Sequence, residues 1–365
     1  MNENMVVVFP SLYSLNKIDY LVSSISIILK TKKLGFSKIR KNGSIIIVEA
    51  DDPVFASSAI ASLFGIEKIA IAKEVENSFN SIVTTIVTVG ANLLLRGERF
   101  YVKVEGTGTE YVPKDIELAA TSELIEKTVN FQTKPGTESR YDKIIYTYIT
   151  KSHAYVCIFI DKGGGGVPYK SQNQKVLCCI YDELSVIACL QTLKMGFDVK
   201  ILVCYSNESD LLNIVKIINQ ILPRLVQTKI KLHFCELDIK SSGRSILLKT
   251  AIITETLVSL AKRIKINRIS LAISPLIFPT WFIEYNTMRI FQKGVIPWFP
   301  LSGIDSSIFD TANEIGLGKH VAKIETLCKT KFKKDLPKDK VNRISQILLR
   351  NIKTVTITLG SKNVH

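Results

Sequence analysis

Lysine and arginine are the residues whose type and spacing point most directly to a chemistry, the binding of phosphate groups. The chain of 365 residues has a formal net charge of +15, more than solubility alone requires. Basic side chains gather near the front and near the end of the chain. The first group is Lys30, Lys32, Lys33, Lys38, Arg40 and Lys41, and the second is Lys329, Lys331, Lys333, Lys334, Lys338, Lys340, Arg343 and Arg350. A solvated Lys-rich surface would explain either group alone, whereas both together favour a nucleic acid partner.

Cysteine and histidine are not spaced for metal binding or catalysis. The seven cysteines include no C-x-x-C pair and lie mostly inside apolar runs, which indicates reduced, buried thiols. The four histidines are scattered, so we expect no structural zinc. No Ser/His/Asp set and no pair of carboxylates stands out, so spacing alone predicts no reaction.

Two glycine-containing segments look like phosphate loops, but their surroundings favour other roles. The run at 163–166 leads into a polar stretch and then a strand, whereas a phosphate loop leads directly into a helix. We interpret this run as part of a hinge linker. The segment SGIDS at 302–306 precedes a helix expected at 307–315, which Asp305 or Ser306 is suited to cap.

The elements that must position these residues alternate between strands and helices. Apolar spacing predicts strands at 5–9, 36–40, 44–50 and 66–72, with helices at 12–34 and 53–64. Lys41-Asn42-Gly43 predicts a hairpin turn. Helices at 78–95 and 113–127 and strands at 100–104, 144–149 and 154–160 follow. We predict a ferredoxin-like α+β module followed by a second mixed module.

A Gly-, Pro- and polar-rich stretch beginning at Asp161 marks the main domain boundary. Beyond it, strands predicted at 176–180, 199–205, 231–235 and 268–273 alternate with helices at 183–195, 211–226 and 246–264. This alternation predicts a doubly wound parallel sheet, in which ligands bind beyond the carboxyl ends of the strands. A site would therefore form near Ile180, Tyr205 and Ile273.

The composition is that of a globular protein, with 46% hydrophobic and 22% charged residues. The first residues, MNENMVVVFP, lack the pattern of a signal peptide, and no apolar run reaches about 18 residues without interruption. We expect a soluble, cytoplasmic protein with no membrane partner.

Several segments resemble the tRNA 4-thiouridine synthetases (tRNA sulfurtransferases), in order and spacing, along nearly the whole chain. LFGIEKIAIAKEV at 63–75, RFYVKVEG at 99–106 and ELIEKTVNF at 123–131 resemble the family's ferredoxin-like and THUMP domains. GGVP at 165–168 looks like the joint GGLP, the stretch 175–196 looks like the strand, loop and helix of the PP-loop ATP pyrophosphatase domain, and PLSGID at 300–305 looks like PLxGxD. The resemblance implies a ferredoxin-like domain at 1–75, a THUMP RNA-binding domain at 76–162, a linker at 163–174 and a Rossmann-like, PP-loop-type domain at 175–365.

The pyrophosphate loop departs from the family pattern. Where the family has SGG-x-DS, this chain has IYDELS at 180–185, so only Ser185 is kept. Tyr181 adds bulk where a glycine would let the backbone wrap around pyrophosphate, and Asp182 adds a negative charge. Both changes oppose ATP binding.

The resemblance also assigns residues. It implies nucleotide contacts for Cys178, Cys179, Ser185 and Arg244, and places Cys328 near the family's sulfur-transferring cysteine; an ordinary surface thiol is the alternative for Cys328. THUMP domains of this family bind tRNA. We therefore expect RNA contacts in the front half of the chain, from the first basic group and from three basic residues of the THUMP segment: Lys30, Lys32, Lys33, Lys38, Arg40, Lys41, Lys103, Lys114 and Arg140.

Two hypotheses follow. The preferred one is a tRNA-binding protein related to these synthetases, without orthodox ATP-dependent sulfur transfer and without a cofactor. The alternative is an active sulfurtransferase that uses ATP and Mg in a divergent loop and forms 4-thiouridine with a persulfide on Cys328, supplied by a cysteine desulfurase. A homodimer is left open.

Overall fold

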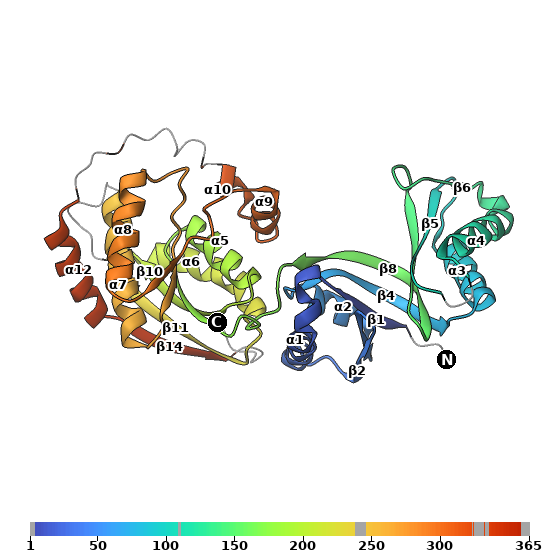
Figure 1. The fold of residues 1–365 in the computed structure, drawn as a ribbon, viewed down its shortest axis with the longest axis horizontal. Helices are drawn as coiled ribbons and strands as arrows, with labels where there is room; N and C mark the ends of the chain where they lie inside the picture. The colour runs from blue at the N-terminus through green and yellow to red at the C-terminus, as the bar shows by residue number, and fades with distance from the viewer. Residues whose placement is uncertain are drawn as a thin grey trace. The chain divides into compact units, whose positions relative to one another are not determined.

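The computed structural model describes residues 4–108, 111–237, 246–322, 324, 332 and 336–358. The chain forms two compact units that meet between Gly165 and Gly166. Both units are mixed α/β structures (Figure 1), so the predicted fold class is confirmed. None of the described helices is long and apolar enough to cross a membrane.

The first half of the first unit has a ferredoxin-like arrangement. Its strands are β1 (Met5–Pro10), β2 (Phe36–Asn42), β3 (Ile45–Ala50) and β4 (Ile66–Glu76), and its helices are η1 (Leu12–Lys17), α1 (Ile18–Thr31) and α2 (Pro53–Ala61). The strands pair antiparallel in the order β2-β3-β1-β4. The hairpin turn is shorter than predicted, because Asn42 pairs with Ile45 and leaves a two-residue loop in which Gly43 has φ +62°.

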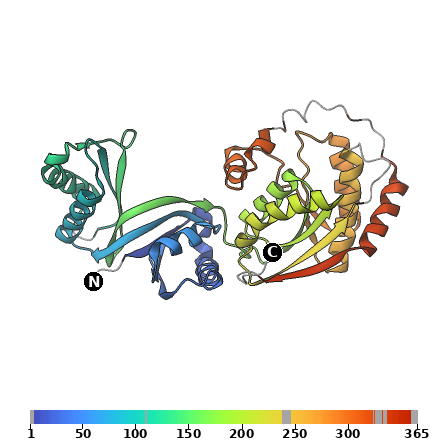
Figure 2. The same cartoon turned by 180° about the vertical axis from the view of Figure 1, so that it is seen from behind.

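The same sheet continues into the second half of this unit through the long strand β8 (His153–Gly165), which pairs antiparallel with β4. The remaining elements are α3 (Phe79–Leu93), β5 (Arg99–Gly106), α4 (Pro113–Lys127), η2 (Val129–Phe131), β6 (Lys134–Pro135) and β7 (Lys143–Ile149). Helices α3 and α4 lie side by side (Figure 2) around buried Ile86, Phe100 and Ile116.

Strand β8 extends further than the sequence predicted and takes up glycines of the run assigned to the linker. Gly165 pairs with Ile66, and a Cβ added at Gly163 would lie 2.4 Å from the carbonyl oxygen of Ile66. Glycine is therefore needed there because β4 approaches closely.

The second unit is a doubly wound sheet, as predicted. Five parallel strands are β9 (Lys175–Ile180), β10 (Asp198–Tyr205), β11 (Lys229–Glu236), β12 (Arg268–Ser270) and β13 (Ile296–Trp298), and β14 (Lys353–Thr358) is antiparallel to β11. The order is β13-β12-β9-β10-β11-β14, so the direction of winding reverses between β9 and β12.

Helices cover both faces of this sheet. Helices α5 (Glu183–Lys194) and α6 (Glu208–Ile221) lie on one face, and α7 (Ile246–Arg263), α8 (Thr280–Gln292) and α12 (Lys338–Arg350) lie on the other (Figure 1). The turn η3 (Leu222–Leu225) follows α6, while α9 (Ser306–Asn313) and α10 (Gly318–Ala322) pack near α5. Helices α8, α10 and α12 and strands β13 and β14 were not predicted from the sequence.

Candidate functional site

The reversal of strand order between β9 and β12 is where a doubly wound sheet binds its ligand. Strand β9 ends at Ile180 and leads through Tyr181 and Asp182 into helix α5. A phosphate-binding protein presents free backbone amides here, at the positive end of the helix. The contacts of these amides therefore decide what the loop can bind.

The backbone N–H groups of this loop already donate hydrogen bonds to the protein's own side chains. Ser185 Oγ accepts hydrogen bonds from the backbone N–H groups of Tyr181, at 2.8 Å, and Asp182, at 2.9 Å. It donates to the Asp182 carbonyl oxygen at 2.7 Å, and the Ser185 N–H donates to Asp182 Oδ1 at 2.8 Å. Asp182 is thus the N-cap of α5 in a capping box. Its carboxyl group accepts from a backbone amide that an anion at this helix end would use.

Tyr181 fills the space beside this cap. Its side chain is buried, a hydrogen bond links it to Thr250 of α7, and the Lys249 ammonium lies 5.5 Å from its ring centroid. Burial and then the neighbouring Asp182 raise the pKa of the Tyr181 hydroxyl well above its ordinary value. A neutral phenol therefore packs the loop against α7.

The electrostatics of Asp182 oppose a second negative charge. Burial raises the pKa of Asp182 above its ordinary value, although the hydrogen bonds from Ser185 and the charge of Lys249 act to lower it. A carboxyl group that is already costly to ionise would be costlier still beside a pyrophosphate.

Two of the other residues that the family resemblance assigned to the nucleotide lie in the strand that precedes this loop. Cys178 and Cys179 are buried in β9, and Cys179 Sγ lies 3.5 Å from Cys204 Sγ in the core of the sheet. The six described cysteines are all free and buried, as their apolar surroundings predicted. Arg244 and Cys328 lie outside the described residues.

The SGIDS segment is a helix cap, which confirms the prediction. Asp305 is the N-cap of α9, and its Oδ1 accepts from the Ile308 N–H at 3.2 Å and from Ser307 Oγ at 2.8 Å. These hydrogen bonds, with that from Ser307 the largest, lower the pKa of Asp305.

The RNA-binding candidates of the first unit fall in several places. Lys30, Lys32 and Lys33 lie at the end of α1, next to β2, which carries Lys38, Arg40 and Lys41; Lys103 is on β5, Lys114 opens α4 and Arg140 precedes β7. Lys41 pairs with Asp19, and Lys114 pairs with Glu117 at 2.8 Å. No ion pair within the described ranges involves the exposed Lys30, Lys32, Lys33, Lys38 or Arg140.

Arg40 is held in a structural network. Its guanidinium pairs with Glu74 of β4, lies 3.4 Å from Glu49, and donates to Tyr155 Oη of β8 at 3.3 Å. Although burial lowers the pKa of Arg40, the hydrogen bonds to Glu74 and Tyr155 raise it more. Arg40 therefore ties β2 to the central strands, and its charge is already neutralised.

The second basic group is only partly described. Lys338, Lys340, Arg343 and Arg350 lie on α12, and the remaining members of the group fall outside the described residues. This helix is anchored by a cluster that the sequence analysis missed.

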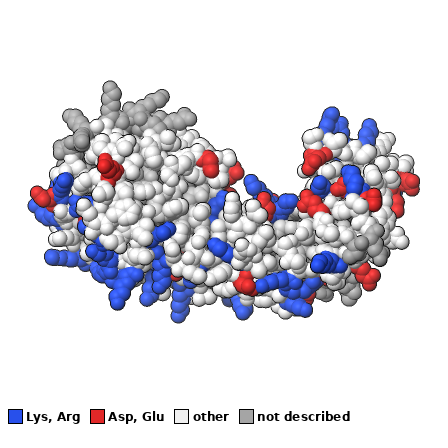
Figure 3. Space-filling view, in the orientation of Figure 1, with Lys and Arg blue, Asp and Glu red and all other residues white. Residues whose placement is uncertain are grey.

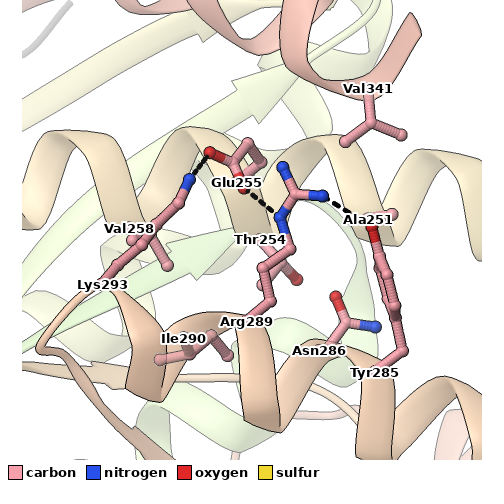
Figure 4. A pocket seen from close by; sticks show the side chains of 10 residues that line it. All are labelled: Ala251, Thr254, Glu255, Val258, Tyr285, Asn286, Arg289, Ile290, Lys293 and Val341. Carbon is pink, nitrogen blue, oxygen red and sulfur yellow. Dashed lines mark hydrogen bonds and ion pairs between the residues drawn. The ribbon is translucent and has the colours of Figure 1, made fainter. Parts of the chain in front are cut away.

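That cluster joins α7, α8 and α12 (Figure 4). Glu255 of α7 is buried; it accepts from Arg289 Nε at 2.9 Å and pairs with Lys293. Arg289 also donates to Tyr285 Oη at 2.6 Å and to Asn342 of α12. Tyr285, Arg289 and Lys293 are spaced four residues apart, and this spacing is the sequence signal from which the cluster could have been predicted. The cavity among these side chains measures about 10 Å³, at the lower limit of the space that one water needs, so the cluster holds helices together rather than binding a ligand.

Comparison with known proteins places this chain beside the tRNA sulfurtransferases. No family model matches the chain. The probable tRNA sulfurtransferases of Methanosarcina mazei and Methanosarcina acetivorans are each 25% identical to it over 191 residues, which is 52% of this chain and 46% of the relative. The chain thus spans about half the length of the curated relatives it matches.

Solved structures share the fold over most of the chain. A crystal structure of a 4-thiouridine synthetase in complex with RNA and bound ATP has a TM-score of 0.69, with 14% identity, over 97% of this chain and 99% of that one. The protein PH1313 from Pyrococcus horikoshii Ot3 has a TM-score of 0.67, with 18% identity, over 86% of this chain and 100% of that one. The chain is therefore related, in sequence and in fold, to the tRNA sulfurtransferase (4-thiouridine synthetase) family.

Proposed function

We propose that this chain is a tRNA-binding protein that keeps the architecture of the 4-thiouridine synthetases without their orthodox ATP-dependent sulfur transfer. The observation that carries the proposal is the occupation of the α5 N-terminus by Asp182 and Ser185. A tRNA partner would place the protein in the cytoplasm.

The residues of this loop do not fit the pyrophosphate of ATP. To expose the amides, ATP would have to break the four hydrogen bonds between Ser185 and the backbone or side chain of its neighbours. At about 1 kcal/mol for each bond, the opening would weaken binding by on the order of 10²- to 10³-fold. It would also leave the Asp182 carboxyl group facing phosphate oxygens.

Charge and fold support RNA as the partner. The net charge is +15, and exposed lysines stand at the end of α1 and on β2. The 4-thiouridine synthetase whose fold this chain shares was crystallised with RNA. Cations that contact phosphates release counterions, so binding should weaken steeply as salt rises.

The test is fluorescence anisotropy with labelled tRNA over a salt series from about 50 to 200 mM. We expect tight binding at low salt and a steep linear fall of log K with log salt. An absence of tRNA binding at the lowest salt, or a slope near zero, would refute the proposal.

The competing function is an active sulfurtransferase with Mg-ATP, a cysteine desulfurase and a persulfide on Cys328. Its support is that both sequence relatives are named tRNA sulfurtransferases and that Ser185 is kept. Incubation with tRNA, Mg-ATP, cysteine and a desulfurase separates the two functions. We expect no 4-thiouridine in the recovered tRNA, whereas its ATP-dependent appearance would establish the enzyme.

A further inference from the structure

The outer edge of the second unit's sheet presents a polar, basic face. Strand β14 lies beside β11 at this edge (Figures 1 and 2). Alternate residues of a strand share one face, and in the register of this pair the residues of one face are Lys229, Lys231 and His233, opposite Thr358, Thr356 and Thr354. We refer to these two strands as the β11–β14 ribbon.

This face is open at one end only. Cys235, further along the same face, is buried beneath α12 and donates to the Leu348 carbonyl oxygen at 3.8 Å. Towards the other end of β11, Lys229, Lys231 and Thr356 are exposed. Among the described residues of the second unit, helix α12 therefore covers the carboxyl end of β11 and not its amino end.

Further cations lie at the ends of α7 and α12, near the covered end of this face. Arg263 at the end of α7 donates to the Leu349 carbonyl oxygen at 2.9 Å, which brings the last turns of α7 and α12 together. Lys262 and Arg350 are exposed on those same turns. Figure 3 shows Lys and Arg side chains gathered along this part of the second unit.

The positive charge of this area is not neutralised as it is in the Glu255 cluster. Within the described part of the chain, no ion pair involves Lys229, Lys231, Lys262 or Arg350. His233 reports the resulting field: burial lowers its pKa, and the charges of Arg263 and Lys231 lower it further.

We propose that the β11–β14 ribbon is a second RNA contact, at which Lys229 and Lys231 bind the sugar–phosphate backbone of the tRNA and Thr356 donates a hydrogen bond. This inference rests on the proposed tRNA binding. A row of cations repeated every ~7 Å along a strand matches a polyanion with regularly spaced charges better than it matches a single small anion. The ribbon uses the amino end of β11, whereas the β9–α5 loop lies at the carboxyl end of the sheet, so the contact positions RNA without taking part in chemistry.

The first experiment compares salt slopes for tRNA binding by the full-length chain. In the variant Lys229→Gln/Lys231→Gln, the loss of two phosphate contacts should make the log–log slope shallower by about 1.5. The control Lys216→Gln/Lys319→Gln removes the same charge from exposed positions on α6 and α10 and should keep the wild-type slope. An unchanged slope in the first variant, or equal flattening in both, would overturn the proposal.

A second experiment locates the contact directly. The chain has four histidines, so NMR signals of the imidazoles can be assigned by single His→Gln variants. His233 Nδ1 lies 2.9 Å from Thr354 Oγ1 within the ribbon, and its signal should move when a short oligouridylate is added to the wild type but not to Lys229→Gln/Lys231→Gln. A His233 signal that is unchanged at saturating RNA contradicts the proposal.

The two proposals fail in different ways. If the wild-type chain does not bind tRNA at all, the proposed function is wrong. If the wild type binds tRNA with a steep salt dependence while the ribbon variant keeps that slope and His233 stays unchanged, only the ribbon contact is wrong.

Discussion

Replacing Ser185 with alanine should destabilise the second unit by about 2–4 kcal/mol. The side chain is only 1% exposed, and its hydroxyl oxygen accepts from the N–H groups of Tyr181 and Asp182. In Ser185→Ala both donors lose their acceptor, and a buried donor left unsatisfied costs about 1–3 kcal/mol. The higher helix propensity of alanine returns less than about 0.7 kcal/mol, so the net effect stays clearly destabilising.

Urea denaturation followed by tryptophan fluorescence measures this effect. Both tryptophans of the chain, Trp281 and Trp298, lie in the second unit, so the signal reports that unit. Ser209→Ala is the matched control, because Ser209 is exposed in the first turn of α6. The control should change the free energy of unfolding by no more than about 0.5 kcal/mol.

An equal, small effect in Ser185→Ala and Ser209→Ala would refute the reasoning. It would mean that the Ser185 hydroxyl does not hold the loop amides, which would then be free to bind an anion. The hydrogen bonds of the loop would then not oppose the binding of ATP.

Three further predictions concern the charged networks. Arg40→Gln should destabilise the first unit by about 2 kcal/mol in urea denaturation, because it leaves partly buried Glu74 without its charged donor. Lys38→Gln, by contrast, should flatten the salt dependence of tRNA binding without changing the urea midpoint of the first unit. Burial raises the pKa of Glu74, but the hydrogen bonds from Arg40 and Tyr155 and the charges of Arg40 and His153 together lower it below its ordinary 4.5. The stability that ionised Glu74 contributes is therefore present above pH 4.5 and lost as pH falls through the folded-state pKa. Glu74→Gln should show a smaller loss of stability below pH 4.5 in an acid titration followed by circular dichroism. Glu255→Ala should cost about 3 kcal/mol in urea denaturation, because Arg289 and Lys293 lose their shared buried partner. An unchanged urea midpoint in Arg40→Gln or Glu255→Ala, or an unchanged acid titration in Glu74→Gln, would contradict the corresponding network.

Local signals were enough to predict most of the fold. The bounds of α4 match the expected 113–127, since Pro113 starts the helix and the apolar spacing continues to its end. The order of strands and helices along the chain also predicted the ferredoxin-like and doubly wound architectures. The missed strand β13 spans three residues and contains Pro297, so it has no periodicity to detect. Helix α12, by contrast, buries Val341, Ser345 and Leu348 at helical spacing, a pattern that was present in the sequence.

The site was less predictable, because its contacts depend on residues far apart in the chain. Asp182 and Ser185 have the spacing of a capping box, so this part was available from sequence. The position of Lys249 over the Tyr181 ring could not be predicted from the sequence, because α7 lies far along the chain from this loop. Likewise, Arg40 looked like a phosphate contact until the fold placed it beside Glu74. The sequence pattern shows which residues are charged but not which of them are already neutralised.

The most direct test of the central claim is a thermal-shift titration of the full-length chain with Mg-ATP and, separately, with tRNA. A ligand that binds only the folded state at 100 times its dissociation constant stabilises it by about 2.7 kcal/mol. We expect tRNA to raise the melting temperature at low salt and Mg-ATP to leave it unchanged at millimolar concentration. A rise with Mg-ATP that disappears in a variant of the β9–α5 loop would contradict the claim that Asp182 and Ser185 have taken the place of the pyrophosphate.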